Sequence, residues 1–140
     1  MENQRKNQKS KSVKAVPEGM HSVTPYLVVD GANGLIRFIE QSFGGKTMSI
    51  MKTKDGRVMH ASVQIGDSQI MVSDSTEKYP AGASRLYLYV DDVDDTYQNA
   101  INANGISLRE PIDEFYGDRS GGIKDAWGNE WWIATHVEDV

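Results

Sequence analysis

The sequence TPYLVVD, residues 24–30, has a counterpart in RLYLYVD, residues 85–91, which lies 61 positions further along the chain. In both stretches apolar side chains occupy alternate positions, a pattern typical of a half-buried β-strand. The same shift aligns Gly44 with Gly105, and each of these glycines stands where a helix is expected to end. The correspondence predicts that the chain contains two copies of one structural module.

Each module is expected to be a β-α-β-β-β unit of an α+β fold. Such a unit exposes one face of its sheet, so two units are expected to share a core or a cleft. The two modules should span residues 20–78 and 82–138 of a single domain, residues 20–140. The first should contain strands at 22–29, 46–53, 58–65 and 69–73 and a helix at 32–43, and the second should begin with a strand at 85–90 and a helix that starts near Val93 and ends at Asn104-Gly105.

The composition restricts the kinds of partner. The chain has 140 residues, no cysteine and a formal charge of −5, which excludes disulfides and thiolate chemistry and makes nucleic acid a poor partner for the folded part. No segment approaches the ~18 consecutive apolar residues of a membrane-spanning helix. We therefore expect no membrane contact and a cytoplasmic location. Residues 1–19, which are basic and polar, are expected to form a disordered tail.

Within this duplicated pattern, four stretches carry a resemblance to a known family. They resemble the vicinal oxygen chelate superfamily, and more narrowly the glyoxalase, bleomycin-resistance and dioxygenase-like proteins. The resemblance covers residues 20–140. It implies a cupped mixed sheet, backed by helices, around a concave cavity that binds a small molecule. It also implies that a second copy of the chain completes this cavity in a homodimer. The stretches are TPYLVVD (24–30), DGRVMHASVQIGDSQIMVSD (55–74), YLYVDDVDDTY (87–97) and YGDRSGGIKDAWGNEWWIATHVEDV (116–140).

The resemblance also implies where a divalent metal would bind. In metal-using members, each module supplies one ligand from its first strand and one from its fourth. None of the corresponding side chains here is a good metal ligand, so the family's metal site is expected to be absent and no cofactor is predicted. The positions carried over are Thr24, Ile70, Arg85 and Trp132. The three histidines, His21, His60 and His136, have no spacing that suggests a substitute site.

Several side chains are candidates for binding the ligand. His60 lies on the polar face of its strand, either as a hydrogen-bonding or acid-base group, and so as a candidate catalytic residue, or as a structural histidine. Arg85, Tyr87 and Tyr89 form either one wall of the cavity or a solvent-facing row in which Arg85 makes an ordinary ion pair. One tryptophan is expected in the core, and Trp132 could line the floor of the cup. The candidate ligand-binding residues are Thr24, Tyr26, His60, Arg85, Tyr87 and Trp132.

Two further charged segments have alternative readings. Asp118 and Arg119, next to Phe115 and Tyr116, could belong to an entrance loop or to a fixed turn with a local ion pair. The acidic residues at 91–95 are expected to start a helix, where carboxylates accept hydrogen bonds from free backbone N–H groups.

The leading hypothesis is a small-molecule-binding protein of the glyoxalase/bleomycin-resistance type that works without a metal. The alternative is a divalent-metal-dependent lyase, isomerase or dioxygenase of the same superfamily. A third reading is an interaction protein that has kept only the fold, since function depends on the site and not on the fold. Whether the chain is an enzyme stays open at this point.

Overall fold

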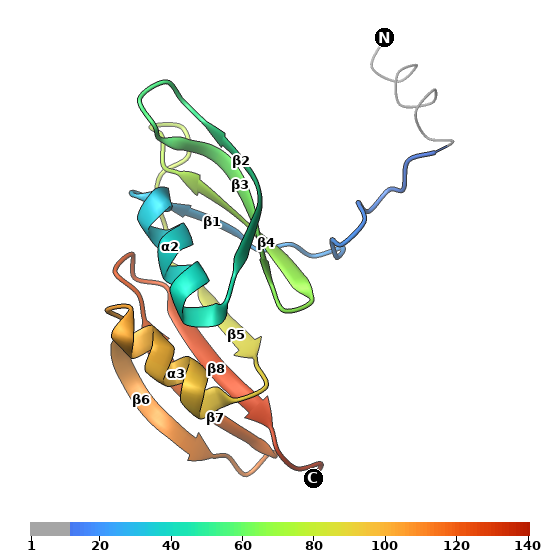
Figure 1. The fold of residues 1–140 in the computed structure, drawn as a ribbon, viewed down its shortest axis with the longest axis vertical. Helices are drawn as coiled ribbons and strands as arrows, with labels where there is room; N and C mark the ends of the chain where they lie inside the picture. The colour runs from blue at the N-terminus through green and yellow to red at the C-terminus, as the bar shows by residue number, and fades with distance from the viewer. Residues whose placement is uncertain (1–11) are drawn as a thin grey trace.

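A computed structural model describes residues 12–140, which form two four-stranded sheets with one helix each (Figure 1). In both sheets the first and fourth strands of the module are parallel neighbours and the remaining pairs are antiparallel, which confirms the predicted tandem β-α-β-β-β fold. The first sheet has the order β1-β4-β3-β2, with β1 (Tyr26–Val29), α2 (Ala32–Phe43), β2 (Lys46–Lys52), β3 (Val58–Ile65) and β4 (Ser68–Asp74). The second has the order β5-β8-β7-β6, with β5 (Arg85–Tyr89), α3 (Val93–Asn102), β6 (Ile106–Asp113), β7 (Asp118–Lys124) and β8 (Glu130–His136).

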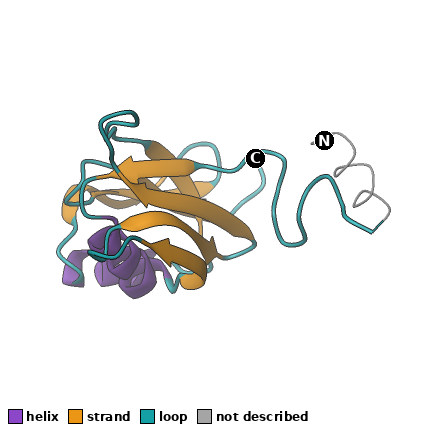
Figure 2. Ribbon diagram, turned by 90° about the horizontal axis from the view of Figure 1, so that it is seen from above, coloured by secondary structure: helices purple, strands orange, loops and turns teal. Residues whose placement is uncertain are grey.

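The two helices pack against each other and lie on the same side of both sheets (Figure 2). The strand side chains that face them alternate with exposed ones, so the helix-facing set forms one hydrophobic core shared by both modules. Trp131 is 1% exposed and is the largest fully buried side chain of this core. The sheet faces opposite the helices carry exposed side chains, among them Tyr26, Met51 and Tyr87.

Local sequence explains where the helices end. Helix α2 stops at Gly44, whose φ of 67° is the left-handed conformation that glycine adopts without steric cost. Helix α3 begins after Asp92, whose side chain accepts a hydrogen bond from the backbone N–H of Asp95. The expected role of the acidic segment in starting this helix is therefore confirmed.

Two sequence-based expectations are wrong, and a third concerns in part residues that the structure does not describe. Strand β1 begins at Tyr26 instead of residue 22, because Pro25 has no N–H and the segment before it forms a turn. Asp118 and Arg119 lie inside strand β7, so the expectation of a loop or turn at these residues is wrong. Residues 12–25 contain no helix or strand. The beginning of this segment extends away from the two modules (Figure 1), whereas Val23 and Pro25 at its end line a cavity between them. The expected disorder of residues 1–11 falls outside the described residues. No helix within residues 12–140 is long and apolar enough to span a bilayer.

Candidate functional site

The exposed face of the first sheet is mostly uncharged and carries two of the candidate residues. Tyr26 and His60 lie on neighbouring parts of this face, with their ring centroids 5.9 Å apart in an edge-on arrangement. Met51 is paired directly across from His60, and Met71 directly across from Tyr26. A cavity of about 530 Å³ opens beside Tyr26, and it is lined by Tyr26, Val28, Met59, Ser73, Asp74, Thr76 and Tyr79.

The exposed face of the second sheet contains a hydrogen-bonded cluster around a buried carboxylate. Asp118 is only 2% exposed, and its Oδ2 accepts hydrogen bonds from the hydroxyls of Tyr87 (2.7 Å) and Tyr89 (2.8 Å). Its Oδ1 lies 2.8 Å from Nδ1 of His136, whose Nε2 lies 2.6 Å from Asp139. The hydroxyl of Tyr116 is 3.3 Å from that of Tyr87. Three strands, β5, β7 and β8, thus bring these groups together.

The pKa shifts in this cluster follow from these contacts. Hydrogen bonds from His136, Tyr87 and Tyr89 hold the pKa of Asp118 below its usual value. The two carboxylates of Asp118 and Asp139 raise the pKa of His136. Burial, together with the hydrogen bonds to Tyr116 and Asp118, raises the pKa of Tyr87. The cluster therefore contains an ionised carboxylate and protonated phenols at neutral pH.

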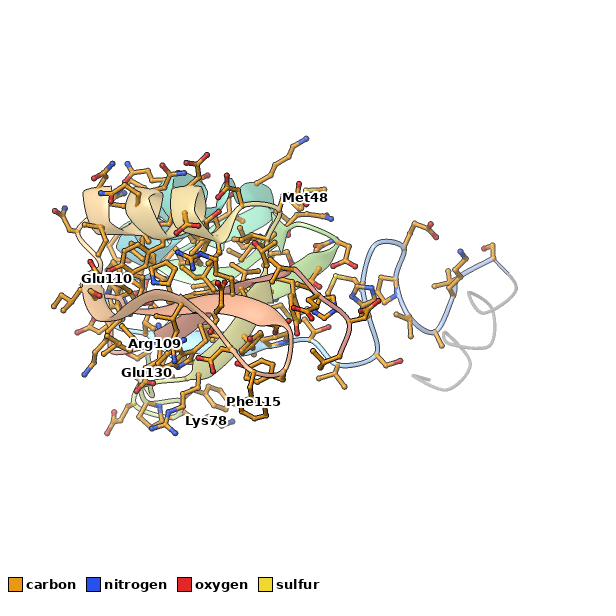
Figure 3. All side chains as sticks on the ribbon, turned by 90° about the horizontal axis from the view of Figure 1, so that it is seen from below. Met48, Lys78, Arg109, Glu110, Phe115 and Glu130 are labelled. Atoms are coloured by element: carbon orange, nitrogen blue, oxygen red, sulfur yellow. The ribbon has the colours of Figure 1, made fainter. Side chains whose placement is uncertain are left out.

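A second group of polar contacts surrounds Trp132. Its indole ring lies flat over Gly122, where an added Cβ would come within 2.6 Å of the ring. The Arg109 guanidinium lies 5.4 Å from the ring centroid and also forms a 2.8 Å ion pair with Glu114. Glu130 accepts a 3.3 Å hydrogen bond from the indole N–H. Figure 3 shows these side chains on the ribbon, with Arg109 and Glu130 labelled.

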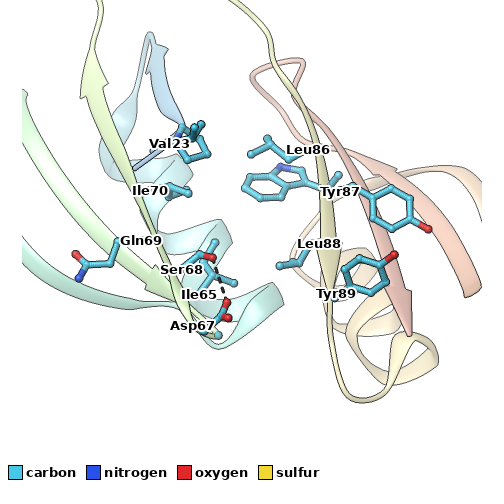
Figure 4. A pocket seen from close by; sticks show the side chains of 13 residues that line it. Val23, Ile65, Asp67, Ser68, Gln69, Ile70, Leu86, Tyr87, Leu88 and Tyr89 are labelled. Atoms are coloured by element: carbon cyan, nitrogen blue, oxygen red, sulfur yellow. Dashed lines mark hydrogen bonds between the residues drawn. The ribbon is translucent and has the colours of Figure 1, made fainter. Parts of the chain in front are cut away.

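A third feature is an apolar cavity of about 550 Å³ between the two modules (Figure 4). Leu86 and Leu88 of β5 point toward Ile70 of the first module across this cavity, while the rings of Tyr87 and Tyr89 point to the opposite side of the strand. Tyr87 and Tyr89 are thus among the residues that line this cavity, but their rings belong to the exposed face of the second sheet.

The remaining candidate residues are placed as follows. Thr24 lies before β1, and its hydroxyl donates a hydrogen bond to the carbonyl of His21. Arg85 has a side chain that is 79% exposed and lies 3.4 Å from Glu130, which matches the ion-pair alternative for this residue. His60 makes no hydrogen bond within residues 12–140, so the structural alternative of a histidine bonded to a neighbouring strand or loop is not what the described part of the chain shows.

One of the four positions carried over from the family's metal site was misassigned. Ile70 is 4% exposed and faces the helices, not the open face of the sheet. The residue that corresponds to Trp132 is Met71, because Tyr26 pairs with Met71 as Tyr87 pairs with Trp132. The one-residue error came from aligning the turns before β4 and β8, which differ in length. Residues 12–140 contain no group of three His, Cys, Asp or Glu side chains able to hold a metal ion.

Sequence reasoning missed the role of Asp118 and did not consider His136 beside it. Strand β7 contains Gly121 and Gly122, which interrupt the apolar alternation by which strands are recognised. The internal duplication could have revealed this strand. The first module has two strands between its helix and its last strand, and the second module is expected to have the same.

Comparisons with known proteins agree with this architecture. The family model described as Glyoxalase/Bleomycin resistance protein/Dioxygenase superfamily matches residues 19–133. The uncharacterized protein Mb0911c of Mycobacterium bovis is 28% identical over 130 residues, which cover 85% of this chain and 86% of that protein.

Solved structures share the fold at low sequence identity. The crystal structure of TioX from Micromonospora sp. ML1 superimposes with a TM-score of 0.68 at 18% identity, covering 83% of this chain and 100% of that one. TnmS3, an antibiotic binding protein from Streptomyces sp. CB03234, gives a TM-score of 0.63 at 20% identity, covering 83% of this chain and 97% of that one.

Proposed function

Because the chain belongs to the glyoxalase/bleomycin resistance protein/dioxygenase superfamily, we propose that it is a small-molecule-binding protein whose ligand is held against the exposed faces of its sheets. The observation that carries the proposal is the cavity of about 530 Å³ at the open face of the first sheet, which Tyr26 and Met59 line. The His60 ring lies beside Tyr26, 5.9 Å from its ring centroid. Pockets of this size, mainly apolar with a few polar groups, are typical of small-ligand sites. TnmS3 is named an antibiotic binding protein, and sequestration of an organic compound is the activity we propose here.

The side chains of this face suit ligands of varied shape. Met51, Met59 and Met71 are flexible and polarizable, so they can adapt to different apolar surfaces, and the aromatic ring of Tyr26 offers a stacking surface. Ser73 in the cavity lining and His60 beside Tyr26 supply polar atoms that can orient the ligand.

We further propose that the site is completed by a second copy of the chain. The strands β2 and β6 are edge strands of their sheets and carry exposed apolar side chains. Exposed apolar residues on unpaired sheet edges favour association with another chain. The exposed residues are Met48, Ile50, Met51, Ile106, Leu108 and Ile112.

A ligand screen tests the proposed function. The full chain, purified without an affinity metal, is first examined by native mass spectrometry for co-purified compounds and then screened by thermal shift against a library of aromatic and heterocyclic compounds. Hits are confirmed by calorimetry. Substituting Tyr26→Ala should weaken a confirmed hit about tenfold, since aromatic contacts contribute about 1 kcal/mol or more.

The matched control is Gln98→Ala, because Gln98 is exposed on α3, on the helix side of the sheets. Its affinity for the hit should not change. The proposal fails if no compound binds stoichiometrically, or if hits bind equally well to variants of the exposed sheet face.

A further inference from the structure

Four aromatic side chains form two linked pairs on the second sheet, and one pair contacts the buried carboxylate of Asp118. Tyr87 and Tyr89 have ring centroids 5.2 Å apart, and Phe115 and Tyr116 have theirs 5.3 Å apart. The hydroxyls of Tyr87 and Tyr116 join the two pairs. All four side chains are at least 40% exposed, and Phe115, at 90%, projects from the surface (Figure 3). These four side chains are more exposed than they would need to be if they only covered Asp118.

The hydrogen bonds in this cluster determine what it offers to a ligand. An ionised carboxylate only accepts hydrogen bonds, so the hydroxyls of Tyr87 and Tyr89 must both donate to Asp118. Tyr87 has thereby used its only proton, and Tyr116 donates to the Tyr87 oxygen. The hydroxyl protons of all three tyrosines are thus used within the cluster, so the phenol oxygens can offer a ligand lone pairs but no protons. The surface presents acceptors and aromatic faces, but no phenolic donor.

The cluster carries a net negative charge, which has the same sign as the partial charge on the phenol oxygens. His136 lies between Asp118 and Asp139, so even with a protonated imidazole the three groups together are negative. Within residues 12–140, the hydrogen bonds and ion pairs of Asp118 come from two tyrosines and a histidine, and none comes from a lysine or an arginine. An anionic ligand would therefore be repelled here.

We propose that Tyr87, Tyr89, Tyr116 and Asp118 form a binding site for an organic ammonium group. A cation over a tyrosine face interacts with the negative side of the ring, and clusters of aromatic rings are a general means of binding alkylated ammonium groups. The phenol oxygens can accept hydrogen bonds from any remaining N–H, and the buried carboxylate supplies the long-range attraction. This inference rests on the proposed function in one respect, because that function places a small-molecule ligand against the exposed faces of the two sheets.

Two arginines of the second sheet are paired with carboxylates. The Arg85 guanidinium is solvent-exposed and lies 3.4 Å from Glu130. Arg109 is likewise paired with Glu114. Both arginines therefore have carboxylate partners, whereas Asp118 is hydrogen-bonded by two phenols and by His136, which also pairs with Asp139.

Three small probes of matched shape test the inference on the full chain. Benzyltrimethylammonium, benzyl alcohol and benzoate share one aromatic ring and differ in charge. In calorimetric and NMR titrations, the ammonium compound should bind about tenfold more tightly than either of the others and should shift the ring signals of the cluster tyrosines. Added salt should weaken its binding, because part of the attraction is electrostatic.

Two kinds of substitution distinguish the contribution of the Asp118 charge to ammonium affinity from the contribution of the tyrosine rings. Asp118→Asn should reduce ammonium affinity about tenfold, and if this variant does not fold, Tyr89→Leu and Tyr116→Leu provide the test at exposed positions. Tyr89→Phe should retain more affinity than Tyr89→Leu, because it keeps the aromatic face. Gln98→Ala, at an exposed position of α3 on the helix side of the sheets, is the control and should leave ammonium binding unchanged.

The inference is overturned if the three probes bind equally, if benzoate binds best, or if the Tyr89→Leu and Tyr116→Leu variants keep full ammonium affinity. It is also overturned if these variants alter only the mass of the particle in solution, since the rings would then form a subunit contact. Library hits that bind at Tyr26 without any preference for ammonium at the cluster would refute this inference alone. A chain that binds neither the hits nor the ammonium probe would refute the proposed function as well.

Discussion

Asp74 and Thr135 occupy equivalent positions in the last strands of the two modules, and each side chain caps the helix of its own module. Asp74 Oδ1 accepts hydrogen bonds from the backbone N–H groups of Gly31 (2.8 Å) and Ala32 (2.9 Å) at the start of α2. Thr135 Oγ1 accepts one from Val93 N–H (2.9 Å) at the start of α3. The two residues are 61 positions apart, so the internal repeat includes the connection between sheet and helix.

Replacing Asp74 should be strongly destabilising. Its buried carboxylate also accepts a 2.7 Å hydrogen bond from the Val58 N–H, so Asp74→Ala leaves three backbone donors without their partner. We expect the free energy of unfolding to fall by about 3 kcal/mol in urea denaturation. Asp67→Ala, at an exposed hairpin position, is the control and should change stability little. A near-neutral Asp74→Ala variant would show that Asp74 does not hold α2 to the sheet.

Gly122 should tolerate no side chain because the ring of Trp132 covers it. In Gly122→Ala the new Cβ would lie 2.6 Å from the indole, so the ring must move. We expect a loss of about 1–3 kcal/mol in stability and a change in tryptophan fluorescence. Gly82→Ala is the matched control, since nothing lies within 4 Å of its added Cβ, and it should be neutral. Equal stabilities of the two variants would contradict this packing.

The sequence predicted features whose pattern lies within one continuous segment, and it did not predict features that depend on residues far apart in the chain. The helix Ala32–Phe43 was predicted with both of its ends, because its apolar spacing and the following Gly44-Gly45 lie within one segment. The Asp118 cluster could not be predicted in this way, since Tyr87, Asp118 and His136 come from three different strands and meet only through strand pairing. Ile70 was placed on the wrong face because a one-residue difference in turn length reverses the direction of every side chain in a strand.

The chain should be a homodimer in solution. Light scattering is expected to give twice the chain mass of 15.6 kDa. Leu108→Asp, on the edge strand β6, should shift the equilibrium toward the monomer, because it places a charge among the exposed apolar side chains of that edge. Asn99→Asp, exposed on α3, adds a charge on the helix side and should leave the mass unchanged. A mass of one chain over a wide concentration range would reject the dimer.

The stability of the Asp118–His136 pair should depend on pH in a defined direction. The pKa of His136 is raised above 6.5 in the folded chain, mainly by Asp118, so its stabilising contribution is complete below pH 6.5 and is lost as the pH rises through the raised value. The pKa of Asp118 is lowered below 3.8, mainly by His136, so its contribution is present above pH 3.8 and is lost as the pH falls.

The pair therefore stabilises the fold most between these limits. Thermal unfolding across this range should show a decline above pH 6.5 that His136→Gln removes. An NMR titration of His136 giving an unshifted value would contradict the pair, since the hydrogen bonds to Asp118 and Asp139 could then not persist in solution.

The last prediction concerns metals and His60. Trp132 and Met71 stand on the exposed faces where the family's fourth-strand ligands would project, and an indole and a thioether are poor partners for divalent Ni, Zn, Mn or Co. A metal bound only to the folded chain at a hundred times its dissociation constant would add about 2.7 kcal/mol of stability, a rise of several degrees in Tm. We expect each of these metals to raise Tm by much less.

His60 makes no hydrogen bond within the described residues, so His60→Ala should change stability by only about 1 kcal/mol or less while weakening a ligand found by screening. A saturable one-to-one metal site that disappears in His60→Ala would instead make the chain a metalloprotein and favour the enzymatic alternative.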